Sequence, residues 1–367
     1  MLITAIVLMT LAILLVLLIL FTLFSPLILR LPQFGQYPSG DRLKRCQRSE
    51  NFRNGQFHNK MQNVLPKGSH RKFIGVLWKF LFSRKGSVTP SQPLPMAFED
   101  LKHLPSERDF YVWFGHSSYL LSLHGITFLF DPVFCAAAPF KFLNKPFRGT
   151  DRYAPEDMPE NIDYLVITHD HYDHLDYETV QRLKGRVRHL VCPLGVGSHF
   201  ESWGWDSQCL MEMDWGESLP LEGEWGRVHC LPSQHFSGRA LKRNNTLWAS
   251  FMLETPCGNI FASGDGGYGP HFKEIGERFS KIDLAILENG QYNEQWKYIH
   301  TLPEQLGQEA DDLHAAQVVT VHHSKYVLAF HAWNEPLLLE KQVSSQCGFP
   351  LIVAELGAIT ELHLIKD

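Results

Sequence analysis

The residues best suited to chemistry lie in one short segment, LVITHDHYDHLD, which runs from Leu165 to Asp176. An apolar run of strand-forming side chains ends at Thr168, and a polar turn follows it directly. Four side chains in that turn can ligate a metal ion: His169, His171, Asp173 and His174. Imidazole suits zinc and similar divalent ions, and a carboxylate adds a harder oxygen ligand and negative charge. A solvated, histidine-rich loop is the alternative, but this spacing directly after a strand favours a metal centre.

A single loop cannot supply enough ligands for two metal ions, so further ligands are expected at the ends of other strands. Three candidates follow apolar runs: His235 in CLPSQHFSGR, Asp265 in FASGDGGYG and His322 in VVTVHHSKY. The glycines around Asp265 let the backbone approach a metal closely because they carry no Cβ atom. Taken singly, each residue has an ordinary alternative, either a core histidine or a glycine-rich turn. Their order and strand context predict a centre of two divalent metal ions, for which zinc is preferred and manganese or iron remains open.

The elements that must position these residues are short β-rich runs that alternate with turns and helices. Predicted strands cover residues 110–114, 119–123, 126–130, 164–168, 188–192, 227–231, 247–254, 259–262, 284–287, 317–321 and 360–365. Predicted helices cover residues 177–183, 272–279 and 303–314. No sequence repeat of fixed period is visible, which argues against a solenoid or a propeller. The pattern predicts an α/β fold.

Residues 1–29 form an apolar run without a charged side chain. As a helix with a rise of about 1.5 Å per residue, this run exceeds the roughly 30 Å hydrocarbon core of a bilayer. A cleaved signal peptide is the alternative, but the run has no basic start, is long for such a peptide and lacks a small-residue cleavage site before Arg30. We therefore expect one N-terminal transmembrane helix over residues 1–29 that stays attached as an anchor.

Residues 30–95 form a basic neck between this anchor and the body of the chain. Arg30 to Lys85 contain 13 lysines and arginines against only Asp41 and Glu50, whereas the whole chain carries a formal net charge of −5. By the positive-inside rule, we expect a single-pass protein whose body lies on the cytoplasmic face of a bacterial inner membrane. Seven scattered cysteines without a CxxC pair agree with a reducing compartment.

Most of the neck is expected to be irregular, with one exception. Arg71 to Lys85 read RKFIGVLWKFLFSRK, so that aromatic and aliphatic side chains are bracketed by basic ones at both ends. An interfacial helix on anionic lipid would explain this pattern. A helix packed on the body explains it equally well, because the apolar residues cover too much of the circumference for a clean amphipathic face.

Several motifs together resemble the metallo-β-lactamase superfamily, and within it the branch of N-acylphosphatidylethanolamine-hydrolysing phospholipase D and its bacterial relatives. The similarity runs from about Asn51 to Pro336 and includes FRNGQFHNK, WFGHSSYLLSLHGITFLFDPVF, THDHYDHLD, PSQHFSGR, SGDGGYGPHF and HHSKYVLAFHAWNEP. This resemblance implies a four-layer αβ/βα sandwich over residues 96–367, with the metals at one edge of its two sheets.

The resemblance also implies which metal each ligand binds. One metal would be held by His169, His171 and His235, and the other by Asp173, His174 and His322. Asp265 would bridge the two. His323 competes with its neighbour His322, which is preferred because it stands where the family motif places its ligand.

The catalytic roles implied by the resemblance fall on two residues. Asp173 would orient the nucleophile, a hydroxide that the metal pair generates from water, and His300 would donate a hydrogen bond to the substrate phosphate or to the leaving group. Two turns near the metal edge, Gly115-His116-Ser117 and Asp131-Pro132, would support the ligands without binding metal themselves.

Three functions are compatible with these residues. The preferred one is a membrane-anchored, metal-dependent phosphodiesterase of the phospholipase D type that acts on N-acylphosphatidylethanolamine-like phospholipids. The others are a hydrolase of a soluble lactone or cyclic phosphate, and a non-catalytic metal-containing membrane protein, against which the complete ligand set argues. Asp170 and Gly266 depart from the phospholipase pattern, which bears on substrate more than on mechanism. The acidic body argues against nucleic acid as a partner, and a homodimer is compatible with the sequence.

Overall fold

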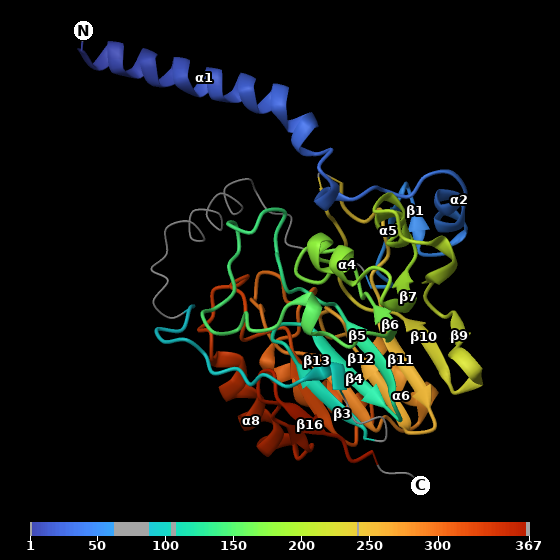
Figure 1. Ribbon diagram of the computed structural model, residues 1–367. Helices are drawn as coiled ribbons and strands as arrows, with labels where there is room; N and C mark the ends of the chain where they lie inside the picture. The colour runs from blue at the N-terminus through green and yellow to red at the C-terminus, as the bar shows by residue number, and fades with distance from the viewer. Residues whose placement is uncertain (1, 62–87, 104–107, 241, 365–367) are drawn as a thin grey trace.

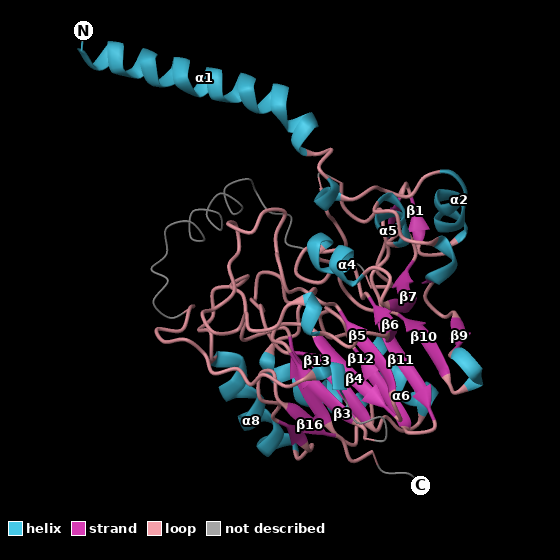
Figure 2. Ribbon diagram, in the orientation of Figure 1, coloured by secondary structure: helices cyan, strands magenta, loops and turns pink. Residues whose placement is uncertain are grey.

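Two seven-stranded β-sheets form the centre of the molecule in the computed structural model, which describes residues 2–61, 88–103, 108–240 and 242–364 (Figures 1 and 2). The first sheet contains, in spatial order, β16 (Ile359–Glu361), β3 (Phe110–Trp113), β4 (Tyr119–Leu123), β5 (Ile126–Phe130), β6 (Ile162–Val166), β7 (Val187–Pro193) and β8 (Leu210–Met213). The second contains β15 (Leu351–Ile352), β14 (Val318–Val321), β13 (Leu284–Glu288), β12 (Gly258–Ala262), β11 (Ser250–Thr255), β10 (Arg227–Leu231) and β9 (Ser218–Pro220).

Each sheet changes from antiparallel to parallel pairing partway across. In the first sheet β3, β4 and β5 pair antiparallel, whereas β5 to β8 pair parallel. In the second, β9 to β12 pair antiparallel, and β12 to β15 pair parallel. Because the carboxyl ends of parallel strands meet at one edge of a sheet, the loops that follow β6, β12 and β14 emerge where a site can be assembled.

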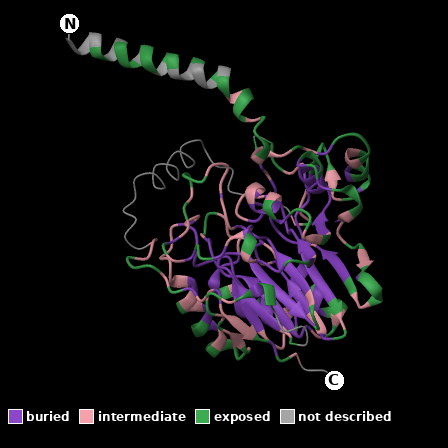
Figure 3. Cartoon of the chain, viewed as in Figure 1, coloured by how far each residue is buried: buried purple, intermediate pink, exposed green. Residues whose placement is uncertain are grey.

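The core lies in three layers because successive strand residues point to opposite faces. Between the sheets, Phe128 and Tyr164 of the first pack in one cluster with Phe251 and Ile286 of the second. The outer face of the first sheet packs on α4 (Tyr177–Leu183) and α5 (Gly197–Ser202). The outer face of the second packs on α6 (His271–Phe279), α7 (Leu306–Asp312) and α8 (Glu335–Cys347). The layer order is therefore helices, sheet, sheet, helices, and the sheets are the most deeply buried part (Figure 3).

The described residues also form six short 3-10 helices: η1 (Pro32–Phe34), η2 (Leu101–His103), η3 (Pro155–Asp157), η4 (Ser207–Cys209), η5 (Glu222–Glu224) and η6 (Pro303–Gln305). The start of α4 has a clear local cause, because the Asp176 carboxylate accepts a hydrogen bond from the Glu178 N–H at 3.2 Å and so caps the helix. This cap matters for the site, since α4 begins where the histidine-rich loop ends.

The neck is more ordered than the sequence predicts. Instead of an irregular segment, residues 40–57 form α2 (Gly40–Arg48) and a hairpin of β1 (Phe52–Arg53) and β2 (Gln56–Phe57). Cys46 and Phe57 are fully buried against the body, in a cluster with Trp248. Arg42 forms ion pairs with Glu201 at 2.5 Å and with Glu212, so part of the basic charge neutralises the acidic body. The predicted interfacial segment from Arg71 to Lys85 lies outside the described residues.

The chain begins with α1 (Leu2–Ile28), which extends away from the body (Figure 1). The described large apolar side chains of this helix are exposed, with Met9 at 61% and Val16 at 54% relative exposure. Within the part of the chain that the structure describes, no helix has both the length and the apolar character needed to cross a membrane. The transmembrane helix predicted over residues 1–29 therefore stays a prediction.

Candidate metal centre

All seven predicted ligands lie together at the edge where the carboxyl ends of the strands meet. The loop after β6 carries His169, His171, Asp173 and His174. The second sheet supplies the rest, with His235 after β10, Asp265 after β12 and His322 directly after β14. Potential ligand atoms of these residues fall into overlapping groups whose members lie within 4.8 Å of one another. Each sheet therefore contributes one side of the cluster.

Three histidines form the first half of the cluster. His171 Nδ1 lies 2.9 Å from His169 Nε2 and 3.3 Å from His235 Nε2, so three ring nitrogens converge on one point. Burial, reinforced by the neighbouring His174, lowers the pKa of His169 well below its usual range, and burial does the same to His235. These imidazoles are therefore neutral near pH 7 and keep the lone pairs that a metal ligand needs.

Asp265 lies between the two halves of the cluster. Its Oδ2 atom is 3.2 Å from His174 Nε2, 3.8 Å from His235 Nε2 and 4.0 Å from His169 Nε2. Its Oδ1 atom is 3.1 Å from His322 Nδ1. Both carboxylate oxygens are thus directed at histidines, and the residue occupies the position expected of a bridging ligand.

The second half of the cluster is rich in negative charge. His174 Nε2 lies 3.6 Å from Asp173 Oδ2, and His174 Nδ1 lies 2.7 Å from Asp131 Oδ2. Burial alone would lower the pKa of His174, but Asp265, Asp173 and Asp131 together raise it well above its usual range. Burial alone would raise the pKa of Asp173, but His174 and His116 outweigh it and lower that pKa. Positive charge is strongly favoured at this point in the protein.

The donor set fits divalent metal ions. Among the described residues, ten buried side-chain nitrogen and oxygen atoms have no hydrogen-bond partner, and three of them belong to predicted metal ligands: His174 Nε2, His322 Nε2 and Asp265 Oδ1. Buried polar atoms without partners are costly, and a bound metal ion would satisfy these three. Neutral imidazoles, carboxylates and a local excess of negative charge are the features that divalent cations require. The fold and donor set therefore imply divalent metal ions, without deciding which metal.

Hydrogen bonds behind the ligands fix their orientation. Asp131 accepts from Thr168 at both the backbone N–H (2.8 Å) and the hydroxyl (2.6 Å) while it contacts His174. The His235 Nδ1 atom lies 2.8 Å from the Ile299 carbonyl oxygen, which it can reach only as a donor. His235 is therefore held in the tautomer that leaves Nε2 for metal, a common arrangement around metal-binding histidines.

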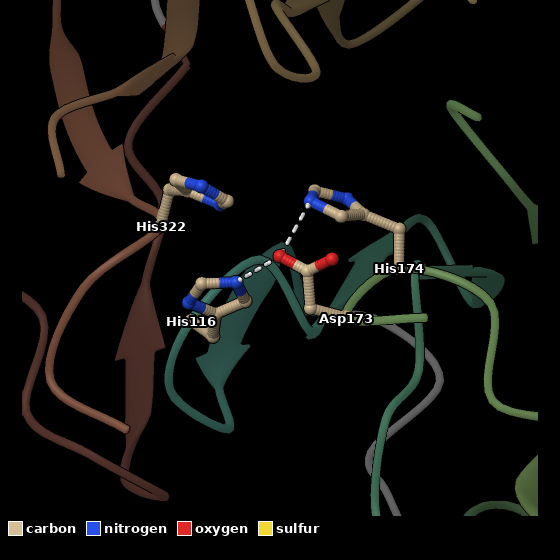
Figure 4. A group of neighbouring side chains, drawn as sticks. All are labelled: His116, Asp173, His174 and His322. Atoms are coloured by element: carbon tan, nitrogen blue, oxygen red, sulfur yellow. Dashed lines mark hydrogen bonds and ion pairs between the residues drawn. The ribbon is translucent and has the colours of Figure 1, made fainter. Parts of the chain in front are cut away.

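His116 joins the second half of the cluster (Figure 4). It comes from the turn after β3, is fully buried, and its Nε2 atom lies 2.9 Å from Asp173 Oδ2. Its ring centroid is 4.1 Å from that of His322. The sequence predicts only that the Gly115-His116-Ser117 turn supports the ligands, and in the structure His116 holds the Asp173 carboxylate in place.

His300 lies beside both halves of the cluster although it follows no strand directly. Its ring stacks on His322 with centroids 5.3 Å apart, and it lies 5.1 Å from the His235 ring. His300 Nδ1 contacts the carboxylate of Glu288, the last residue of β13. Burial and the nearby Asp265 raise the pKa of Glu288 well above its usual range. Sequence reasoning missed Glu288, and its one signal was an acidic residue that ends the apolar run LAILE.

Two neighbouring residues prove to have other roles. His323 lies 2.8 Å from the Ser324 hydroxyl and 3.2 Å from that of Thr320, so it faces away from the cluster. This arrangement leaves His322 as the residue of the pair that the structure brings to the site. Asp170 is buried and accepts hydrogen bonds from the Gly238 N–H at 2.8 Å and the Thr246 hydroxyl at 2.9 Å. These bonds hold the loop after β6 that carries four of the ligands, which we call the ligand loop.

Together, the two-sheet sandwich and the clustered histidines and carboxylates define a metal-dependent hydrolase architecture. Among known proteins, a family described as "Beta-lactamase superfamily domain" matches residues 127–323, more than half of the chain and the whole stretch that carries the predicted ligands. The chain therefore belongs to the metallo-β-lactamase superfamily, and it is a metal-dependent hydrolase of that fold.

Known relatives lie both in bacteria and in eukaryotes. An uncharacterized protein of Mycobacterium tuberculosis is 34% identical over 310 residues, which cover 79% of this chain and 78% of that protein. N-acyl-phosphatidylethanolamine-hydrolyzing phospholipase D 1 of Caenorhabditis elegans is 32% identical over 234 residues, covering 59% of this chain and 64% of the relative. The N-acyl-phosphatidylethanolamine-hydrolyzing phospholipase D of Saccharomyces cerevisiae is 33% identical over 247 residues, covering 65% and 52%.

Solved structures show the same fold at lower identity. A metallo hydrolase from the archaeon Ignicoccus hospitalis superposes with a TM-score of 0.54 at 19% identity, over 70% of this chain and 98% of that one. CmlA, a diiron β-hydroxylase from Streptomyces venezuelae, superposes with a TM-score of 0.54 at 18% identity, over 71% of this chain and 55% of that one. At such identities the likeness concerns the fold alone.

Proposed function

We propose that this hydrolase is a phosphodiesterase of the phospholipase D type that cleaves N-acylphosphatidylethanolamine-like phospholipids at a membrane. The observation that carries the proposal is the complete set of seven ligand-type side chains with His300 beside it. Similarity to two N-acyl-phosphatidylethanolamine-hydrolyzing phospholipases D supports the choice of substrate. The histidine-rich donor set makes zinc the proposed metal.

The proposed chemistry assigns a task to each nearby side chain. A bound metal pair would supply positive charge at the phosphoryl group and lower the pKa of water. Asp173, held by His116 at 2.9 Å, is placed to orient a nucleophilic water. The raised pKa of Glu288 keeps its carboxyl group protonated, so Glu288 donates to His300 Nδ1 and the ring carries its proton on Nε2. His300 Nε2 can then donate a hydrogen bond to a phosphoryl oxygen or to the departing alkoxide.

We further propose that α1 anchors the protein in a membrane with the body on the cytoplasmic face. The exposed apolar side chains of α1 support an anchor, because an apolar helix in water is unfavourable. The buried thiols of Cys46, Cys192 and Cys230 support a reducing compartment.

The test measures metal content and substrate range of the full chain purified in mild detergent. Mass spectrometry gives the metal per chain, and activity is assayed on N-acylated and ordinary glycerophospholipids and on a soluble phosphodiester, with Asp265→Asn as the inactive control. Two metals with lipid turnover that the variant loses would establish the phospholipase. Two metals with turnover of the soluble ester alone would replace the lipid substrate by a small molecule, and metal without any hydrolysis would favour a non-catalytic role.

A further inference from the structure

The long connection between β5 and β6 carries an exposed aromatic tip. Phe142 and Leu143 are 70% and 59% exposed, and they are among the most exposed large apolar side chains of the described body. The Phe142 ring stacks on Phe140, with centroids 5.7 Å apart and planes at 15°. We call residues 138–143 the aromatic loop.

The aromatic loop is held at its base. The Asp176 carboxylate accepts hydrogen bonds from the backbone N–H groups of Cys135 (2.8 Å) and Ala136 (3.0 Å), and Lys141 pairs with Glu178 at 2.8 Å. Because the base of the loop is fixed, the fold itself holds Phe142 and Leu143 in contact with solvent. Large apolar side chains that the fold keeps exposed to solvent indicate a surface that binds an apolar partner.

Aromatic contacts connect the aromatic loop to the end of α1 and to the metal centre. Phe34 follows α1 and lies 6.2 Å from the Phe140 ring and 6.3 Å from the Tyr172 ring. Tyr172 stands between the ligands His171 and Asp173. Figure 1 shows that the chain between β5 and β6 rises on the side of the body where α1 joins it. A bilayer that held α1 would therefore meet the aromatic loop beside the site.

A pocket of about 320 Å³ lies behind the aromatic loop. It is lined by Gln33, Phe140, Phe142, Tyr172, Tyr177 and Arg239. Arg239 forms part of its wall, where the guanidinium lies over the Tyr172 ring and the Nε atom donates to the Gln33 carbonyl at 2.9 Å. The lining also includes the charged residues Lys141, Asp176 and Glu178, and the pocket extends from the exposed tip to Tyr172, which belongs to the ligand loop.

The charges around the aromatic loop favour a lipid surface over an apolar protein. Lys145 and Arg148 are exposed just after the loop, in addition to the exposed Lys141, which pairs with Glu178. Aromatic side chains flanked by cations suit the boundary between acyl chains and anionic headgroups, where rings enter the apolar layer and cations stay at phosphate depth.

We infer that the aromatic loop docks on a bilayer containing anionic lipid, inserts Phe142 and Leu143 at the acyl boundary, and thereby presents lipid to the metal centre through the pocket behind it. This inference rests on the proposed function, because it assumes that the substrate is held in a membrane. It adds a second contact with the bilayer, separate from α1, and assigns the route by which substrate enters.

Photo-crosslinking of the full chain tests the docking without relying on turnover. Phe142→p-benzoylphenylalanine is reconstituted with vesicles of phosphatidylcholine and phosphatidylglycerol, irradiated and analysed by mass spectrometry. The matched control is the same replacement at Leu338, which is 62% exposed on α8, far from α1 in Figure 1. A lipid adduct at position 142 alone is the expected result. Adducts at both positions or neither, or a protein–protein adduct at 142, would overturn the inference.

A kinetic measurement tests the entry route. Phe142→Ser combined with Leu143→Ser removes the apolar tip and leaves the metal ligands untouched. We expect the apparent KM for lipid in vesicles to rise roughly tenfold while turnover of a soluble phosphodiester stays unchanged. Equal loss on both substrates would refute the route. If no lipid is hydrolysed at all, the proposed function fails, and the crosslinking still decides whether the loop meets a bilayer.

Discussion

Asp131→Asn provides a sharp test of how the ligands are organised. Asp131 is not among the predicted ligands, yet its carboxylate lies 2.7 Å from His174 Nδ1 and accepts two hydrogen bonds from Thr168. The variant keeps the size of the side chain and removes its negative charge. Loss of such a supporting carboxylate typically lowers metal affinity 10- to 100-fold, which corresponds to about 1.4 to 2.7 kcal/mol.

The expected loss is confined to one metal site. His174 belongs to the half of the cluster with Asp173 and His322, whereas the three-histidine half has its own support, including the Ile299 carbonyl behind His235. Titration of the metal-free protein with Zn²⁺ against a chromophoric chelator should show one weakened site and one unchanged site.

A matched control separates this effect from general damage. Asp170→Asn removes another buried carboxylate, this one from the ligand loop after β6, where it contacts His199, Thr246 and Gly238 and no predicted ligand. We expect it to reduce stability while both metal affinities stay within a few-fold of the wild type. Equal weakening of both sites by Asp131→Asn, or no weakening at all, would refute the assignment of His174 to a separate site.

Three further changes follow from the geometry. His300→Gln should lower kcat by roughly 10²- to 10⁴-fold with metal content unchanged in mass spectrometry, and a loss of metal instead would make His300 a ligand. Burial lowers the pKa of His271 to about 4, so its neutral form contributes about 3 kcal/mol to the free energy of unfolding, which is present above pH 6.5 and lost as the pH falls toward 4. In urea unfolding, His271→Gln should therefore lose about 3 kcal/mol less stability than the wild type over this pH range. Parallel stability profiles for the two proteins would contradict this expectation. Gly290→Ala would place a Cβ 2.1 Å from the His322 carbonyl oxygen and should lower both Tm and metal content, whereas Gly238→Ala, whose Cβ comes no closer than 3.4 Å to another residue, should change neither.

The chemistry of the site could be predicted from the sequence because each ligand belongs to a short local pattern of residues. Each ligand follows an apolar run, and strands β4, β5 and β10 and helix α4 have the predicted bounds. The strand before the histidines ends at Val166 and not at the predicted Thr168. Ile167 still donates to the Val191 carbonyl of β7 at 2.9 Å, and the Thr168 carbonyl accepts from Ala249, the residue before β11, at 3.0 Å. The strand boundary is therefore gradual, and the prediction falls only two residues away.

What the sequence could not reveal depends on contacts between distant residues. The apolar side chains of α8 are mostly consecutive in sequence, so the helix has no apolar period of about 3.6 residues from which it could be predicted. Its buried Glu340 reads as a surface residue in the sequence, but Asn289 and Thr320 hydrogen-bond to it. The basic residues of the neck predict a membrane orientation, yet one of them, Arg42, is paired with Glu201 and Glu212 of the body. Pairing across about 160 residues leaves no local trace. Glu288 was overlooked for the same reason, since its partner His300 arrives from a loop.

The buried Arg239 determines how far the chain can be shortened from its start. Besides the Gln33 carbonyl, this guanidinium donates to the carbonyl oxygens of Asp170 at 3.0 Å, within the ligand loop, and of Leu175 at 2.6 Å, directly after its last ligand. A deletion that ends upstream of Pro32 keeps this link. A deletion that removes Gln33 leaves the buried Arg239 guanidinium without one of its hydrogen-bond acceptors, and Arg239 then holds the ligand loop after β6 less firmly. Fusion points and trimmed variants should therefore lie before Pro32, and a chain cut a few residues later would lose metal even with every ligand in place.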